Sequence, residues 1–192
     1  MHDDLASTIG SIAIYVELLK KSLQYRDKNA LMLFHRTQKL INDATYAITD
    51  LIWTIKPSSE SLSQLLVRIN ENFVNLFSEK RVEFTTELKI ENREIKLEPA
   101  IKHNIYLILK EALNNILKYA SADNVTLIVV QKGKNISFSV VDDGKGFELN
   151  DVGDNGNGLK NMKKRSEEIG ADFEIDANLG EGTKINVYLK IA

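Results

Sequence analysis

A repeat of apolar residues with a period of seven, within residues 29–56, constrains the fold of this chain more than any other feature of its sequence. The apolar residues that recur every seven positions are Phe34, Ile41, Ile48 and Ile55. The residues three positions after the first three of these are Thr37, Ala44 and Leu51. A seam of this kind, sustained over several heptads, predicts a long helix that packs against partner helices.

Residues 4–24 predict a shorter amphipathic helix before it, because their apolar residues follow steps of three and four. The polar segment QYRDKN separates the two helices, so together they predict a helical hairpin. A hairpin alone buries its seam poorly, whereas two hairpins from two chains would form a four-helix bundle. We therefore expect a homodimer through residues 2–56. The alternative is that the hairpin packs on the rest of its own chain.

The segment IKPSSESLSQ indicates a domain boundary. Pro57 ends the second helix, because proline lacks an N–H and disfavours helix at the residue before it. The serines that follow can cap a new helix. We therefore predict two domains, 1–58 and 59–192. The elements expected in the second domain are helices that end near Lys80 and that span 97–120 and 157–169, a strand at 82–90, and hairpins at 124–143 and 172–191. This pattern predicts the α+β class, with mainly antiparallel strands in an α/β layer structure after the N-terminal helical hairpin.

Composition and charge exclude several classes of protein. The 192 residues carry a net charge of −2 and no basic stripe interleaved with aromatic residues, which argues against direct nucleic-acid binding. The absence of cysteine excludes disulfides and thiolate metal sites, and is compatible with a reducing cytosol. No apolar run approaches the roughly 20 residues of a membrane span, and MHDDLASTIG lacks the apolar core of a signal peptide. We expect a soluble chain, although a longer parent could be anchored in the inner membrane.

The predicted helix at 97–120 carries a row of polar residues. Glu111 and Asn115 are four residues apart and share a face, and Lys118 lies three residues further along. An acid, an amide and a cation in this order can hold a hydrated Mg²⁺ and the phosphates that it bridges, because magnesium prefers a few oxygen ligands together with water and phosphate. Taken alone, these residues also fit an ordinary solvated helix face.

The stretch VVDDGKGF places a carboxylate and two glycines after an apolar strand, as Asp142, Gly144 and Gly146. A carboxylate at a strand end can accept a hydrogen bond from an exocyclic amine such as that of adenine. The glycines would let the backbone approach a flat ring closely. The alternative is a glycine-rich turn without a ligand.

Two more loops complete the set of candidate motifs. Gly156, Gly158 and Leu159 open a helix whose first N–H groups could face an anion. In GEGTK, Thr183 enters the last strand and could support the carboxylate of Asp142. The alternatives are a helix N-terminus with nothing bound and a plain hairpin turn. Neither GxxxxGK[ST] nor a complete GxGxxG occurs, so these loops are not a P-loop or a dinucleotide fingerprint.

The order and spacing of these four motifs resemble the ATP-binding domain of sensor histidine kinases. That domain is shared in outline with Hsp90, the MutL proteins and the type II topoisomerase ATPases. The resemblance covers about residues 60–192 and implies an α/β sandwich with a Bergerat (GHKL) ATP pocket and a flexible lid at residues 147–157. The implied contacts to adenine and its surroundings come from Asp142 and Thr183. The residues implied to shape the pocket and lid are Gly144, Gly146, Gly156, Gly158 and Leu159.

The same resemblance implies the other end of the nucleotide site. Asn115 would ligate Mg²⁺, with Glu111 beside it as a catalytic residue and Lys118 near the nucleotide. The cofactors implied are therefore ATP and Mg²⁺.

The N-terminus separates the members of this broad family. HDDLAST resembles the H-box of histidine kinases associated with NarL/LuxR-type response regulators, and LIWTIKP is similar to the same family. The resemblance implies that His2 is the phosphoacceptor and Asp3 the neighbouring general base. A neutral imidazole is a good nucleophile, and an adjacent carboxylate can orient it and take its proton. His35 and His103 lie mid-helix without a motif and are interpreted as structural or surface residues.

Three departures from the family pattern limit what carries over. The family has several helical residues before its H-box, so we expect a truncated piece of a longer protein whose autophosphorylation could be weak. Ser7 stands where the family often has the Gln that orients water for dephosphorylating the regulator, which puts phosphatase activity in doubt. Tyr119 stands where the family commonly has His, so the role of that histidine does not carry over.

The resemblance therefore implies the cytoplasmic catalytic core of a two-component sensor histidine kinase. It would phosphorylate His2 with ATP and pass the phosphoryl group to an aspartate of a response regulator. Two alternatives remain. A GHKL-type ATPase switch would form no phosphoprotein, and a non-enzymatic dimerisation module would not bind ATP with magnesium.

Overall fold

The computed structural model describes residues 61–92, 94–148 and 157–191, together with the isolated positions 34, 37 and 41. The chain divides into two compact units, Met1–Pro57 and Ser58–Ala192. The predicted hairpin and bundle, and the proposed site residues His2, Asp3 and Gly156, lie outside the described residues. The helices and strands between Leu62 and Lys190 all belong to the second unit.

Helix α3 (Leu62–Glu79) opens this unit, as its sequence predicts. Its first turn is closed by the Gln64 side chain, which accepts a hydrogen bond from the backbone N–H of Ser61 at 3.0 Å. This is one half of a capping box, and it satisfies a donor that the helix itself leaves unpaired. The residues that α3 buries are Leu62, Leu65, Leu66, Ile69, Phe73 and Phe77.

The five strands form one mixed sheet in the order β1-β2-β3-β5-β4. Their bounds are β1 Glu83–Ile90, β2 Asn124–Lys132, β3 Asn135–Asp142, β4 Asp172–Asn178 and β5 Gly182–Lys190. β2–β3 and β4–β5 are hairpins, as predicted, and β3 also pairs antiparallel with β5. β1 pairs parallel with β2, because the long connection through a helix returns the chain to the same end of the sheet.

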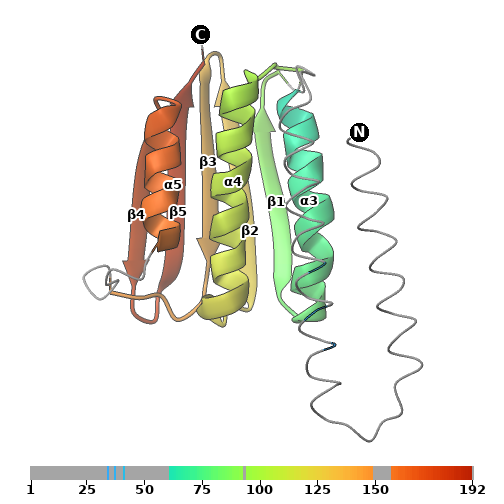
Figure 1. The fold of residues 1–192 in the computed structure, drawn as a ribbon, viewed down its shortest axis with the longest axis vertical. Helices are drawn as coiled ribbons and strands as arrows, with labels where there is room; N and C mark the ends of the chain where they lie inside the picture. The colour runs from blue at the N-terminus through green and yellow to red at the C-terminus, as the bar shows by residue number, and fades with distance from the viewer. Residues whose placement is uncertain are drawn as a thin grey trace, which may run out of the picture. The chain divides into compact units, whose positions relative to one another are not determined.

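Three helices lie side by side on one face of this sheet (Figure 1): α3, α4 (Pro99–Asn115) and α5 (Asn157–Glu168). The alternating residues that face them are buried, and in the inner strands these are Val125, Leu127, Val129, Ile136, Phe138, Val140, Ile185, Val187 and Leu189. The mixed α/β fold and the elements expected in the second domain are confirmed, with ends that agree within about two residues except at the C-terminal end of the long helix. Within the described residues, no helix combines the length and the apolar character needed to cross a membrane.

The last turn of the long helix differs from the prediction. Residues Ile116–Ala120, labelled η1, form a π-helix that continues α4. It ends at Ser121, whose φ of 53° places it in the left-handed region. π-turns are rare and occur frequently at functional sites. The sequence period predicted an uninterrupted α-helix here, so this turn is a correction that bears directly on the site.

Candidate functional site

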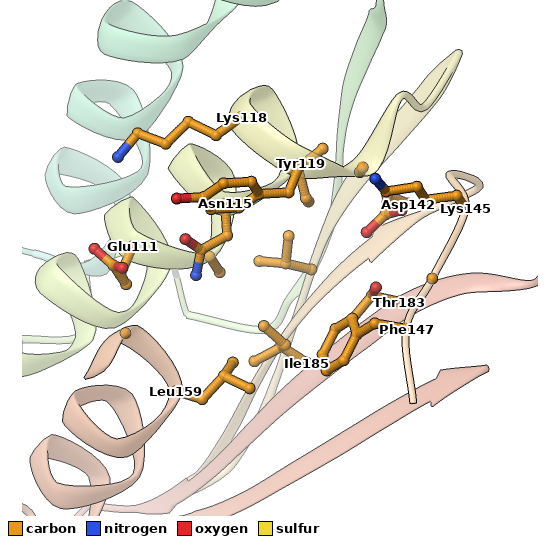
Figure 2. Close-up of a pocket in the computed structure, with 16 residues that line it drawn as sticks. Glu111, Asn115, Lys118, Tyr119, Asp142, Lys145, Phe147, Leu159, Thr183 and Ile185 are labelled. Atoms are coloured by element: carbon orange, nitrogen blue, oxygen red, sulfur yellow. The ribbon is translucent and has the colours of Figure 1, made fainter. Parts of the chain in front are cut away.

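A cavity of about 460 Å³ opens between α4, α5 and the end of the sheet. Figure 2 shows side chains from several parts of the chain converging on it. The predicted site residues that line it are Glu111, Asn115, Lys118, Asp142, Gly146, Gly158, Leu159 and Thr183. Segments far apart in the sequence thus bring most of the predicted set to one place. Gly144 lies beside the cavity without lining it.

One end of the cavity holds a buried carboxylate. Asp142 is only 4% exposed, and its Oδ1 accepts a hydrogen bond from the Gly144 N–H at 2.9 Å. Burial raises the pKa of the Asp142 carboxyl above its ordinary value, while the bonds from Gly144 and Thr183 act in the opposite direction. A buried carboxylate with unused acceptor capacity favours a ligand that brings an N–H donor.

The other end of the cavity is formed by α4 and η1. Glu111 and Asn115 project from successive turns of α4, and Lys118 follows in η1 (Figure 2). Gly158, in the first turn of α5, packs against the acid–amide pair of Glu111 and Asn115. A Cβ on Gly158 would overlap Glu111 Oε1 and lie 3.3 Å from Asn115 Nδ2. The glycine therefore lets α5 approach the acid–amide pair closely.

The walls between the two ends are apolar, and apart from Phe147, which begins the predicted lid, the sequence motifs did not assign their residues to the site. Ile116, Val140 and Ile185 line the cavity, with Tyr119 and Phe147 coming from opposite sides (Figure 2). A signal for two of them was present, because Val140 lies two residues before Asp142 and Ile185 two after Thr183. Residues two apart on a strand share a face. Lys145 also lines the cavity at the Asp142 end, and no motif assigned it a role.

The glycines of the D-x-G-x-G loop, Asp142–Gly146, also have a role in packing that the sequence did not indicate. A Cβ on Gly144 would overlap the Ala120 carbonyl oxygen, and one on Gly146 would overlap the Asn178 carbonyl oxygen. The missing side chains therefore leave room for the protein's own backbone. The Lys145 N–H donates to Ala120 O at 2.8 Å, and the Gly180 N–H donates to Lys145 O at 2.7 Å. The loop is held between η1 and the β4–β5 turn.

Asp143 anchors the same loop from its other side. Its Oδ1 accepts hydrogen bonds from the backbone N–H groups of Asp123 and Asn124 at 2.9 and 2.8 Å, and its Oδ2 accepts from Asn124 Nδ2 at 2.7 Å. These bonds, those from Asn124 first, lower the pKa of the Asp143 carboxyl. The carboxylate thus fixes the end of β3 to the start of β2.

We predict that Asp143→Ala lowers the free energy of unfolding by about 1–2 kcal/mol at neutral pH. Bonds to a charged acceptor exceed neutral ones, but this group is exposed and solvent screens it. Because the folded-state pKa is lowered, the contribution is present above the unfolded value near 3.9 and is lost as the pH falls through the folded value. Urea unfolding at several pH values measures this, and the wild-type–variant difference should shrink in acid.

The matched control exchanges the two partners, as Asp143→Asn combined with Asn124→Asp. The side-chain amide and carboxylate then still bond each other, and the amide oxygen placed at position 143 can still accept from the two backbone N–H groups. This double variant should retain most of the stability lost in Asp143→Ala. If the difference in free energy of unfolding between the wild type and Asp143→Ala were the same at pH 3 and pH 7, the role given to the charge of Asp143 would be contradicted.

The donor set at the Glu111 end fits a hard cation only in part. Among the described residues, no group of three or more His, Cys, Asp and Glu side chains gathers in one place. A carboxylate and an amide oxygen suit magnesium, which takes its other ligands from water and phosphate. The residues therefore fit a magnesium ion that arrives with a phosphorylated ligand rather than one held in a protein cage.

Comparison with known proteins gives this cavity a context. Residues 100–192 match the family described as histidine kinase-, DNA gyrase B-, and HSP90-like ATPase. The sensor histidine kinase LiaS of Bacillus subtilis is 23% identical over 191 residues, which cover all of this chain and 52% of LiaS. The sensor protein VraS of Staphylococcus saprophyticus is 30% identical over 150 residues, which cover 78% of this chain and 42% of VraS. The chain thus spans about half the length of these curated relatives.

Solved structures show the same fold at low identity. Full-length ShkA, determined in complex with AMPPNP, superposes with a TM-score of 0.64 at 16% identity, covering 100% of this chain and 45% of ShkA. The histidine kinase domain of the blue-light activated kinase of Erythrobacter litoralis EL346 gives 0.61 at 16% identity, covering 97% of this chain and 94% of that domain. The described elements therefore have the fold of a histidine kinase ATPase domain.

Proposed function

We propose that this chain is a sensor histidine kinase, on the strength of its family match and its similarity to LiaS and VraS, and that it binds ATP in the cavity and transfers the γ-phosphoryl group to His2. The ATP-binding part corresponds to residues 59–192 and the phosphoacceptor part to residues 1–58. We include in the proposal a homodimer through residues 2–56 and a cytoplasmic location for this core. A longer parent protein could be anchored in the inner membrane.

The observation that carries the proposal is the polarity of the cavity. A buried carboxylate, Asp142, stands at one end, and the row of Glu111, Asn115 and Lys118 stands at the other (Figure 2). The walls between them are apolar and aromatic. A nucleotide has the same sequence of properties, with an amine donor on a flat ring at one end and phosphates at the other.

Each end of the cavity would bind a different part of the nucleotide. Asp142 would accept a hydrogen bond from the exocyclic amine of adenine, which satisfies a carboxylate that burial otherwise penalises. Tyr119, which is 63% exposed, and Phe147 would cover the ring and exclude water from it. Lys118 would face the phosphates, because it lies at the end of the cavity away from Asp142.

Asn115 and Glu111 are the residues that would hold magnesium together with the phosphate oxygens. When bound, the ion would neutralise charge that develops on the transferring phosphoryl group. Asn115 would supply an amide oxygen. Glu111 would accept hydrogen bonds from the water molecules around the site and so orient them.

The transfer itself would use the N-terminal unit. A ring nitrogen of His2 would form a bond to the γ-phosphorus as the bond to the β–γ bridging oxygen breaks, and ADP would leave. Asp3 would orient the imidazole and take the proton that the ring loses. The phosphoryl group would then pass to an aspartate of a response regulator, of the NarL/LuxR type by the similarity of HDDLAST. This part of the proposal is supported by the sequence alone.

Incorporation of label from γ-labelled ATP tests the proposed function. The comparison needs the chain itself, His2→Gln, and the control variants His35→Gln and His103→Gln. We expect acid-labile, base-stable label in the chain and in both controls, and none in His2→Gln. Label that survives in His2→Gln would assign the acceptor elsewhere. ATP binding without any label would favour the ATPase switch.

Gly158→Ala should weaken binding of magnesium-ATP by about tenfold while leaving the fold intact. The added Cβ overlaps the end of the Glu111 side chain, which is flexible enough to move, so the cost falls on the site rather than on stability. Calorimetric titration with AMPPNP, with and without magnesium, measures the effect. The loss should be larger with magnesium, because the displaced groups are those proposed to hold the ion.

Asn161→Ala is the matched control, since Asn161 lies exposed on the same helix. It should bind the nucleotide like the wild type under both conditions. Equal losses for Gly158→Ala with and without magnesium would show that the substitution disturbs the cavity as a whole and not the acid–amide pair.

A further inference from the structure

The π-turn η1 is tied to the rest of the domain at both of its ends. The last carbonyls of a helix have no partner within the helix and must find one elsewhere. Leu117 O accepts a hydrogen bond from Lys80 Nζ at 2.7 Å, and Ala120 O accepts one from the Lys145 N–H at 2.8 Å. One tie therefore comes from the end of α3 and the other from the D-x-G-x-G loop.

Lys80 is suited to this contact by its place in the fold. It is the residue that follows α3, it is exposed, and it does not line the cavity. An ammonium group that meets the carbonyl end of a helix interacts favourably with the helix dipole as well as with the oxygen. The contact holds one carbonyl of the turn from outside, on the side of α4 where α3 packs (Figure 1).

The register of η1 decides where two cavity residues point. Lys118 and Tyr119 are both in this turn and both line the cavity. A π-turn is wider than an α-turn and rotates each successive side chain less about the helix axis. Conversion of this turn to α would therefore move both side chains around the axis, while Glu111 and Asn115 in α4 would stay where they are.

We infer that Lys80 is a positioning residue for nucleotide binding, which holds η1 in its π register and so directs Lys118 and Tyr119 into the cavity. This inference rests on the proposed function, because it assigns a purpose to the cavity that those two residues line. It places a determinant of affinity outside the cavity and outside the motifs of the domain. Its effect is transmitted through a backbone carbonyl.

The test uses Lys80→Met, which keeps the length of the side chain and removes its charge and its donor, and Lys80→Arg, which keeps both. Lys89→Met, at an exposed position of β1, is the matched control. We expect ADP to bind about tenfold more weakly to Lys80→Met, and like wild type to Lys80→Arg and Lys89→Met. Wild-type affinity in Lys80→Met would overturn the inference.

A double-mutant cycle with Tyr119→Ala separates positioning from a general loss of stability. If Lys80 acts by directing Tyr119, its removal should cost clearly less in the Tyr119→Ala background than in the wild type. A general structural effect would cost the same in both backgrounds. Equal losses would therefore overturn the positioning role.

A second readout does not depend on any nucleotide. Backbone amide chemical shifts of Tyr119, Ala120 and Ser121 in the ligand-free chain should change in Lys80→Met and remain near wild type in Lys80→Arg. Unchanged shifts in Lys80→Met would overturn the inference. If the wild type binds no adenine nucleotide but Lys80→Met still changes these chemical shifts, the result would count against the proposed function. The contact between Lys80 and η1 would then remain supported.

Discussion

Gly146→Ala is expected to destabilise the domain by about 4 kcal/mol or more, the largest effect of any single substitution that we predict. Two costs add at this position. The φ of 58° lies in the left-handed region, which costs a non-glycine residue about 1–2 kcal/mol. The added Cβ would also overlap the Asn178 carbonyl oxygen, which belongs to a rigid hairpin end and cannot move aside without opening the loop.

Gly133→Ala provides a control that isolates the second cost. Gly133 has almost the same φ, 56°, but no atom lies within 4 Å of the position that its Cβ would occupy. It should lose only about 1 kcal/mol. Chemical unfolding of both variants measures the difference directly. Similar losses at the two glycines would show that the β4–β5 turn gives way, and would remove the argument that this turn clamps the D-x-G-x-G loop.

Asp142→Asn is expected to weaken ATP binding by about a hundredfold or more. The two side chains have nearly the same shape, but the amide replaces a charged acceptor by a neutral group with a donor of its own, which would face the adenine amine unproductively in the proposed complex. A lost charge-assisted bond together with an unpaired buried donor accounts for about 3 kcal/mol. Calorimetric titration gives the affinity. Asp176→Asn, at an exposed position of β4, should bind like the wild type.

Asp142→Asn should weaken ATP binding but should not lower the stability of the ligand-free protein. Because burial raises the folded-state pKa of this carboxyl, the folded state holds its proton more tightly than the unfolded state does. Ionisation of Asp142 therefore costs stability as the pH rises from the unfolded value near 3.9 through the folded value. At neutral pH the variant should melt at the same temperature as the wild type or higher. A large fall in Tm would mean that the carboxylate is needed for the fold and would weaken its assignment to ligand binding.

The nucleotide affinity of the wild type should also depend on pH through the ionisation of Asp142. In the proposed contact the amine of adenine bonds the ionised carboxylate, so the affinity should be complete well above the raised pKa of Asp142 and should decline as the pH falls through it. This decline should be absent in Asp142→Asn, whose weak binding should not depend on the ionisation of this group.

The part of the site that could be predicted from the sequence is the part set by local periodicity. Glu111 and Asn115 share a helix face because of the four-residue spacing, and Asp142 stands at a strand end because an apolar alternation stops there. The hairpins followed from alternation and turn residues in the same way. Each of these features depends on residues within a few positions of one another, and a single sequence contains that information.

The features that escaped prediction depend on residues far apart in the chain. The bond from Lys80 to Leu117 joins residues 37 positions apart, and no local pattern marks the π-turn that it holds. The parallel pairing of β1 with β2 and the insertion of β5 between β3 and β4 are likewise set by packing. The backbone neighbours of Gly144 and Gly146 escaped prediction for the same reason, since Ala120 and Asn178 come from other elements.

The sheet order has a further consequence for how this domain tolerates change in its length. β3 and β5 are direct partners, so the whole segment from Asp143 to Glu181 is a closed loop whose ends are joined by the central ladder of the sheet. The entropy of closing such a loop grows only with the logarithm of its length, and a doubling costs about 0.6 kcal/mol. Residues added between Glu148 and Gly158 would therefore cost little in folding free energy. The pairing of β3 with β5 therefore does not fix the number of residues between Glu148 and Gly158, and the sheet can form with a shorter or a longer connection.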